Sequence, residues 1–166
     1  DKKIAGIAHE AGKGIVVVVN KWDLIEKETN TMNEFRKMIA KELAFMPYAP
    51  NVFISVLNHK RVDQVISMAR TVAENRAMRV STGQLNSLIT DATMMKQPPS
   101  DKGRRLKIYY VTQVAVKPPL FSFQINDREL MHFSYARYLE NKIREAFGFK
   151  GTSLRFIIRE RKEKDQ

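Results

Sequence analysis

An unbroken apolar run, Ile15 to Val19, constrains this chain most, because it leads directly into the polar sequence Asn20 to Asp23. All five residues of the run are β-branched and follow Gly14, a pattern that predicts a strand buried on both faces. A strand of that kind lies inside a parallel sheet covered by helices, and such sheets bind ligands at the carboxyl ends of their strands. We therefore expect the polar residues to lie at a ligand site.

The polar sequence has the pattern N-K-x-D, whose chemistry suits guanine. Guanine presents two adjacent donors, N1–H and the 2-amino group, so the Asp23 carboxylate can accept both in a charge-assisted pair. Adenine would leave that carboxylate unpaired, and sites built on such pairing discriminate by about 10⁴-fold or more. The aliphatic part of Lys21 can lie along the base, and Asn20 can brace the loop. The alternative is a strand that simply ends in a polar turn.

Several further motifs occur together with this one. They are His9-Glu10-Ala11-Gly12-Lys13-Gly14, Arg105 to Tyr110, Val116 to Pro119, Leu130 to Tyr135 and Phe147 to Phe149. Taken with the N-K-x-D sequence, they resemble the Der/EngA family of bacterial double-Era-like GTPases over essentially all 166 residues. The resemblance implies an α/β part followed by an α+β part. Residues 1–78 would be the back half of the second GTPase domain, an incomplete Rossmann-like P-loop domain, and residues 79–166 a KH-like α-β-β-α-β domain.

The resemblance also implies a function. The parent protein would bind and hydrolyse GTP and act in assembly of the large (50S) ribosomal subunit in the cytoplasm. Its cofactors would be GTP or GDP, with Mg²⁺ in the full-length protein, and its partners the 50S subunit or its rRNA and GTPase domain 1 of the same protein. In that family the loop at Ser55 completes the base pocket, and the N–H of the next residue, here Val56, donates to guanine O6.

Other signals limit what this segment does alone. There is no G-x-x-x-x-G-K-[ST] loop and no D-x-x-G before the first strand, so we expect no catalytic residue, no metal ligand and no GTP hydrolysis by this segment. The chain has no Cys, its three His are scattered, and no apolar run is long enough to span a membrane.

The charge is concentrated in the second half of the chain. Net charge is +11 overall, of which residues 79–166 contribute +8, so this half is the better candidate for contact with nucleic acid. The candidate phosphate contacts are Arg104, Arg105, Lys107, Lys117, Arg159, Arg161 and Lys162. The sequence Gly148 to Gly151 has the G-x-x-G form of RNA-clamping KH loops, but it joins a helix to a strand, so we predict only a helix end.

Two alternative functions follow from these signals. One is a non-catalytic module that binds RNA or the ribosome through its basic half. The other is a different Era-type GTPase with a KH tail, which the Val116 to Pro119 and Leu130 to Tyr135 motifs disfavour.

Hydrophobic periodicity gives the remaining elements. Helices are predicted over 4–11, 32–44, 62–78, 82–95 and 130–147, and strands over 51–55, 105–115, 120–125 and 154–158. Thr82 is the predicted cap of its helix. Apolar positions expected to fill the core include Phe35, Met38, Ile39, Leu43, Met94 and Met95.

Overall fold

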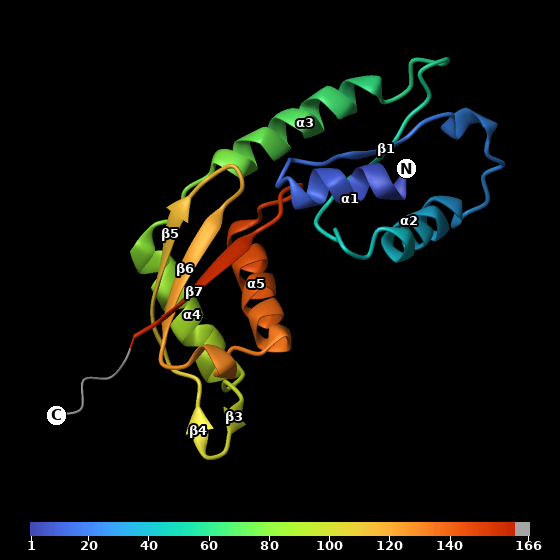
Figure 1. The fold of residues 1–166 in the computed structure, drawn as a ribbon. Helices are drawn as coiled ribbons and strands as arrows, with labels where there is room; N and C mark the ends of the chain where they lie inside the picture. The colour runs from blue at the N-terminus through green and yellow to red at the C-terminus, as the bar shows by residue number, and fades with distance from the viewer. Residues whose placement is uncertain (162–166) are drawn as a thin grey trace. The chain divides into compact units, whose positions relative to one another are not determined.

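The computed structural model describes residues 1–161, which form two compact units (Figure 1). Unit 1 contains Asp1–Ala77 and Phe149–Ser153, and unit 2 contains Met78–Gly148 and the described residues from Leu154 onward. This division differs from a single cut at residue 79, because a short segment from late in the chain packs within unit 1.

Unit 1 is built from two parallel strands and the helices that connect them. In chain order it contains α1 (Lys2–Glu10), β1 (Val17–Val19), the 3-10 helix η1 (Trp22–Leu24), α2 (Thr31–Glu42), β2 (Asn51–Phe53) and α3 (Val62–Ala77). β1 pairs with β2 in parallel, with Val18 opposite Val52. Since the strands are parallel, the segments that leave their carboxyl ends meet at one edge.

The expectation that the first strand is buried on both faces is wrong for this structure. β1 covers only Val17–Val19, and the Val18 side chain is 40% exposed. Among the described residues β1 has one neighbouring strand, so one side of the apolar run lacks the packing that a central strand receives. The run predicted the strand correctly but not its degree of burial.

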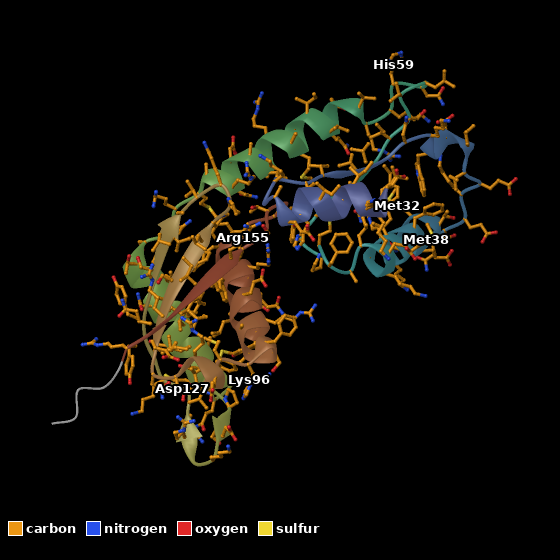
Figure 2. The ribbon with its side chains drawn as sticks, viewed as in Figure 1. Met32, Met38, His59, Lys96, Asp127 and Arg155 are labelled. Carbon is orange, nitrogen blue, oxygen red and sulfur yellow. The ribbon has the colours of Figure 1, made fainter. Side chains whose placement is uncertain are left out.

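The expected core positions of α2 are only partly covered. Phe35 packs against Trp22, with ring centroids 5.1 Å apart, but Met38 is 52% exposed (Figure 2). Helical spacing shows which residues share a face, whereas burial depends on what packs against that face. No residue of α2 is fully buried, and on α3 only Val72 is.

The late segment is held in unit 1 by its backbone. Gly151 accepts a hydrogen bond from Ile15 N at 2.8 Å and donates to Tyr48 O at 3.0 Å, while Asn75 Nδ2 donates to Lys150 O at 2.9 Å. The Phe149 side chain is completely buried. Just before this segment, Gly148 caps the preceding helix, which confirms the helix end predicted for the G-x-x-G sequence.

Unit 2 contains α4 (Thr82–Met95), β3 (Ser100–Asp101), β4 (Arg104–Arg105), β5 (Ile108–Ala115), β6 (Leu120–Ile125), the 3-10 helix η2 (Arg128–Leu130), α5 (Phe133–Phe147) and β7 (Arg155–Glu160). The predicted α-β-β-α-β order of unit 2 is confirmed by α4, β5, β6, α5 and β7, with a short β3–β4 hairpin added after α4. The sheet order is β5-β6-β7, with β5 antiparallel and β7 parallel to β6. The short β3–β4 hairpin falls in a stretch predicted partly as a loop and partly as the start of a long strand.

One face of this sheet forms the core of unit 2. Phe121, Phe123 and Ile125 of β6 alternate with more polar residues and are completely buried, as is Val111 of β5. Buried residues of α4 and α5, such as Leu85 and Leu139, fill the same core, and β5 and β6 pass in front of α4 in Figure 1.

Three details of the helices were predicted wrongly. Met94 and Met95 are 74% and 73% exposed, so neither fills the core. These residues stand at helix ends, where few neighbouring residues cover them. The cap of α4 is Ser81, whose side chain accepts a hydrogen bond from Gln84 N, and Thr82 is the first helical residue.

We expect Gly151→Ala to destabilise unit 1. A Cβ at this position would lie 2.1 Å from Val72 Cγ2, and φ is +85°, so the substitution adds left-handed strain and overpacking, together about 2–4 kcal/mol of unfolding free energy. Urea denaturation followed by fluorescence of Trp22, the only tryptophan, measures it.

Gly6→Ala is the control, because nothing lies within 4 Å of its Cβ and alanine favours the helix. Val72→Ala removes the methyl groups that the new Cβ would meet. The losses of unfolding free energy caused by Val72→Ala and by Gly151→Ala should therefore not add in the double variant. Strict additivity would contradict the steric explanation.

Candidate functional site

The carboxyl ends of β1 and β2 are joined by one side chain. Asn20 Oδ1 accepts hydrogen bonds from Lys21 N at 2.7 Å and from Val56 N at 3.3 Å. Asn20 follows β1 and Val56 lies beyond β2, so this amide holds together two loops that are far apart in sequence. This is the bracing role expected of Asn20.

The buried Trp22 side chain anchors the loop that follows β1. Trp22 is 3% exposed and its ring packs against Phe53 with centroids 4.7 Å apart, while its backbone N–H donates to Ile54 O at 3.0 Å. Lys21 adopts a left-handed conformation with φ of 59° just before it. This turn directs Trp22 inward, while Lys21 stays exposed and Asp23 partly exposed.

Asp23 and Ser55 come together across the two loops. A hydrogen bond from the Ser55 side chain is the main influence that lowers the pKa of the Asp23 carboxyl, and the charges of Lys27 and Lys60 lower it further. Ser55 itself is buried, and its Oγ also accepts a hydrogen bond from Asn58 N at 3.2 Å. The site therefore presents an ionised carboxylate at neutral pH, which can accept two adjacent donors.

The second loop is fixed by contacts that the sequence did not reveal. Ser55 and Lys60 exchange backbone hydrogen bonds of 3.1 and 2.9 Å, and Arg61 Nε donates to Phe53 O at 2.7 Å. His59 lies at the tip of this loop (Figure 2). The only hint in the sequence was the basic stretch that includes these residues, and it does not show that Arg61 bonds back to the strand.

Val56 differs in one respect from its expected role. The side chain is half exposed, so its extra methyl groups reach solvent, but its N–H already donates to Asn20. This donor was expected to face the base. At 3.3 Å the bond is long, and the N–H lies at the exposed rim of the loop.

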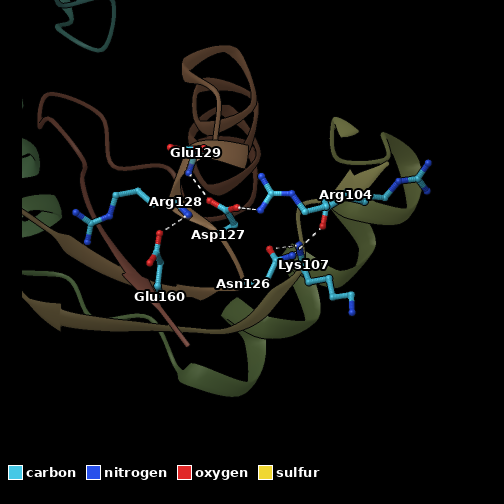
Figure 3. A network of polar contacts seen from close by, with 8 residues as sticks. Arg104, Lys107, Asn126, Asp127, Arg128, Glu129 and Glu160 are labelled. Atoms are coloured by element: carbon cyan, nitrogen blue, oxygen red, sulfur yellow. Dashed lines mark hydrogen bonds and ion pairs between the residues drawn. The ribbon is translucent and has the colours of Figure 1, made fainter. Parts of the chain in front are cut away.

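Two of the candidate phosphate contacts of unit 2 already pair with neighbouring side chains (Figure 3). Arg104 forms an ion pair with Asp127 at 2.5 Å, and Arg105 Nη1 donates to Gln97 Oε1 at 2.8 Å. Asn126 ties the strand end together by accepting from Lys107 N at 2.8 Å. Arg104 and Arg105 of the β3–β4 hairpin are therefore oriented by side chains that lie outside the hairpin.

The structure gathers most of these cations but not all of them. By strand register, the end of the sheet that carries Lys107 also carries Arg159 and Arg161. Lys117 lies beyond the opposite end of β5, a strand of eight residues, which separates it from Lys107 by roughly 25–30 Å. Lys162 lies outside the described residues.

Residues 1–161 contain no group of three or more His, Cys, Asp or Glu side chains that could hold a metal ion. No helix in that range is long and apolar enough to cross a membrane.

Comparison with known proteins identifies the family. Residues 79–159 match the family described as the KH-domain-like C-terminal region of EngA bacterial GTPase enzymes. Over 165 residues, 99% of this chain, it is 59% identical to GTPase Der of Acetivibrio thermocellus and 58% identical to those of Agathobacter rectalis and Alkaliphilus oremlandii. The chain belongs to the Der (EngA) family. It spans 37–38% of the length of these relatives, and its second unit is the KH-like domain of the family.

We expect Ser55→Ala to raise the pKa of Asp23, because the hydroxyl that holds the carboxylate is lost. Carboxyl-carbon NMR titration measures the shift. The folded-state pKa of Asp23 is depressed, so the Ser55 contact stabilises the fold above the unfolded pKa and this contribution disappears as pH falls through the folded value. Ser67→Ala, an exposed serine on α3, should leave the Asp23 titration unchanged. An unaltered titration in Ser55→Ala would remove the basis for the contact.

Proposed function

We propose that unit 1 selects guanine for a protein that binds and hydrolyses GTP. The observation that carries this proposal is the Asp23 carboxylate, which accepts a hydrogen bond from the Ser55 side chain at the edge where two parallel strands end. Guanine would donate N1–H and its 2-amino group to the two oxygens of Asp23. The exposed Lys21 would cover the base with its aliphatic part, and the Val56 N–H would approach guanine O6.

The contact between Asn20 and Val56 suggests how the loops respond to the base. Asn20 has a firmer partner in Lys21 N at 2.7 Å, so the 3.3 Å bond to Val56 can lengthen at small cost. Binding the base would then redirect the Val56 N–H while Asn20 keeps the first loop in place.

Hydrolysis itself is assigned to other parts of a full-length protein. The GTP phosphates and Mg²⁺ would be bound there, and we assign neither a metal ligand nor a catalytic residue to this segment. Unit 1 would contribute the back half of a Rossmann-like P-loop domain, a proposal supported by the parallel β1–β2 pair and the helix between these strands. GTPase domain 1 of the same protein would be a partner.

A second role is proposed for unit 2. Its excess of positive charge and the cluster at one end of its sheet support contact with rRNA of the 50S subunit, in keeping with a cytoplasmic, ribosome-associated assembly factor. If this segment acted without nucleotide, the same surface would support the alternative of a non-catalytic RNA-binding module.

In full-length protein, Asp23→Asn should weaken guanine-nucleotide binding by about 1.5–3 kcal/mol, the loss of charge-assisted hydrogen bonds. It should also shift preference toward xanthine, which carries a carbonyl where guanine has its amine. Calorimetric titration with GDP and XDP measures both effects. Asp63→Asn, an exposed acid at the start of α3, is the control. Unchanged GDP affinity in Asp23→Asn would count decisively against the site.

Replacing Arg104, Arg105 and Lys107 together by Ala should weaken RNA binding by the chain. The slope of log K against log salt concentration should also become shallower, by up to about 0.7 for each phosphate contact that is lost. Filter binding of an rRNA fragment over a range of salt concentrations measures this. The matched control removes three exposed cations of unit 1, Lys3, Lys37 and Lys41. Equal losses in both variants would show general charge attraction and no local contact.

A further inference from the structure

The face of the unit 2 sheet that points away from the core, here called the open face, carries different residue types from the core face. Strand register places Tyr110 of β5 opposite Gln124 of β6, and Gln124 opposite Arg159 of β7. The adjacent row contains Val111 and Phe123, both completely buried in the core. Since side chains alternate along a strand, the first row lies on the other face.

This open face is basic and carries no acid. Within β5, β6 and β7, all of which the structure describes, the only carboxylate belongs to Glu160. Glu160 pairs with Ile125, a core-facing position, and accepts a hydrogen bond from Arg128 N at 2.8 Å (Figure 3). Arg159 is exposed on the open face. Arg155 (Figure 2) lies four residues earlier on the same strand, so alternation places it on the same face. The face therefore complements a negatively charged partner.

The row Tyr110–Gln124–Arg159 places three complementary groups side by side. Neighbouring strands are about 4.8 Å apart, so each side chain lies beside the next. Tyr110 is 42% exposed although it stands within a strand, which leaves its ring available to a planar partner. An aromatic ring, an amide and a guanidinium are the groups that proteins use to stack on a base, to bond to its edge and to pair with a phosphate.

We propose that this row binds single-stranded RNA. Tyr110 stacks on a base, Gln124 hydrogen-bonds to the edge of that base, and Arg159 pairs with a phosphate. This inference rests on the proposed contact between unit 2 and RNA and names the face that makes it. An acidic peptide would suit the charge, but it would gain nothing from an exposed aromatic ring between polar neighbours.

The test measures fluorescence anisotropy of a labelled oligouridylate with the 166-residue chain. Tyr110→Thr removes the ring and keeps a residue that favours strands, and Tyr110→Phe keeps the ring. Tyr110→Thr should weaken binding about 5- to 150-fold, the effect of losing one stacked base, with its salt slope unchanged. Tyr110→Phe should bind as the original chain does. Arg159→Ala should lower the salt slope by about 0.7.

The controls are Phe133→Ala and Arg137→Ala, which remove an exposed aromatic and an exposed arginine of α5 in the same unit. Neither should change affinity or salt slope. Circular dichroism melting verifies that each variant is folded.

The outcomes separate this inference from the function on which it rests. If the chain binds RNA and the Tyr110 and Arg159 variants bind it equally well, the inference is overturned and the RNA contact of unit 2 lies elsewhere. If the chain binds no RNA, the proposed contact itself fails. If polyglutamate displaces RNA and Tyr110→Thr binds both polyanions unchanged, the face attracts anions in general and the stacking role is wrong.

Discussion

The parallel pairing of β1 with β2 is the constraint on which the candidate nucleotide site depends. It brings two strand ends to one edge, where a side chain as short as that of Asn20 can reach Val56 on the neighbouring loop. The bond from Trp22 N to Ile54 O continues the alignment beyond the strands themselves. Burial of the Trp22 ring between aromatic neighbours is worth about 2–3 kcal/mol, so the loop that follows β1 is fixed by packing before any ligand arrives.

The residues that follow β1 occupy both exposed and buried positions. Trp22 is buried in the core, whereas Lys21 is exposed and Asp23 is partly exposed. The left-handed conformation of Lys21 reverses the chain, so the buried ring separates two accessible charged residues. The short 3-10 turn that follows leaves Asp23 within reach of the Ser55 hydroxyl, whose hydrogen bond lowers the pKa of the carboxyl. Trp22 thus stabilises the fold, and the residues on either side of it are the ones proposed to contact the ligand.

The sequence predicted the type and order of most elements, because periodicity reports which residues share a face. It failed where the outcome depends on the neighbours of that face: Val18, Met38 and Met95 are apolar, but too little of the described chain covers them. Residue chemistry suggested Asn20, Lys21 and Asp23 as site residues, and the family resemblance added Ser55. The backbone bonds of Lys60 and Arg61 could not be predicted, since a hydrogen bond from a long cation to a carbonyl leaves no periodic pattern.

The edge of the unit 2 sheet explains why its open face is the more accessible surface for a partner. An edge strand exposes unpaired N–H and C=O groups that can pair with another chain. On β5, the amide of Asn86 occupies both groups of Val111, with hydrogen bonds of 2.9 and 2.7 Å, and Gln113 Nε2 bonds to Ala115 O at 3.3 Å further along. Strand addition is therefore blocked in the middle of the edge, because those backbone groups already have partners. A ligand that approaches β5 meets the side chains of the open face, and among these Tyr110 is exposed beside Gln124.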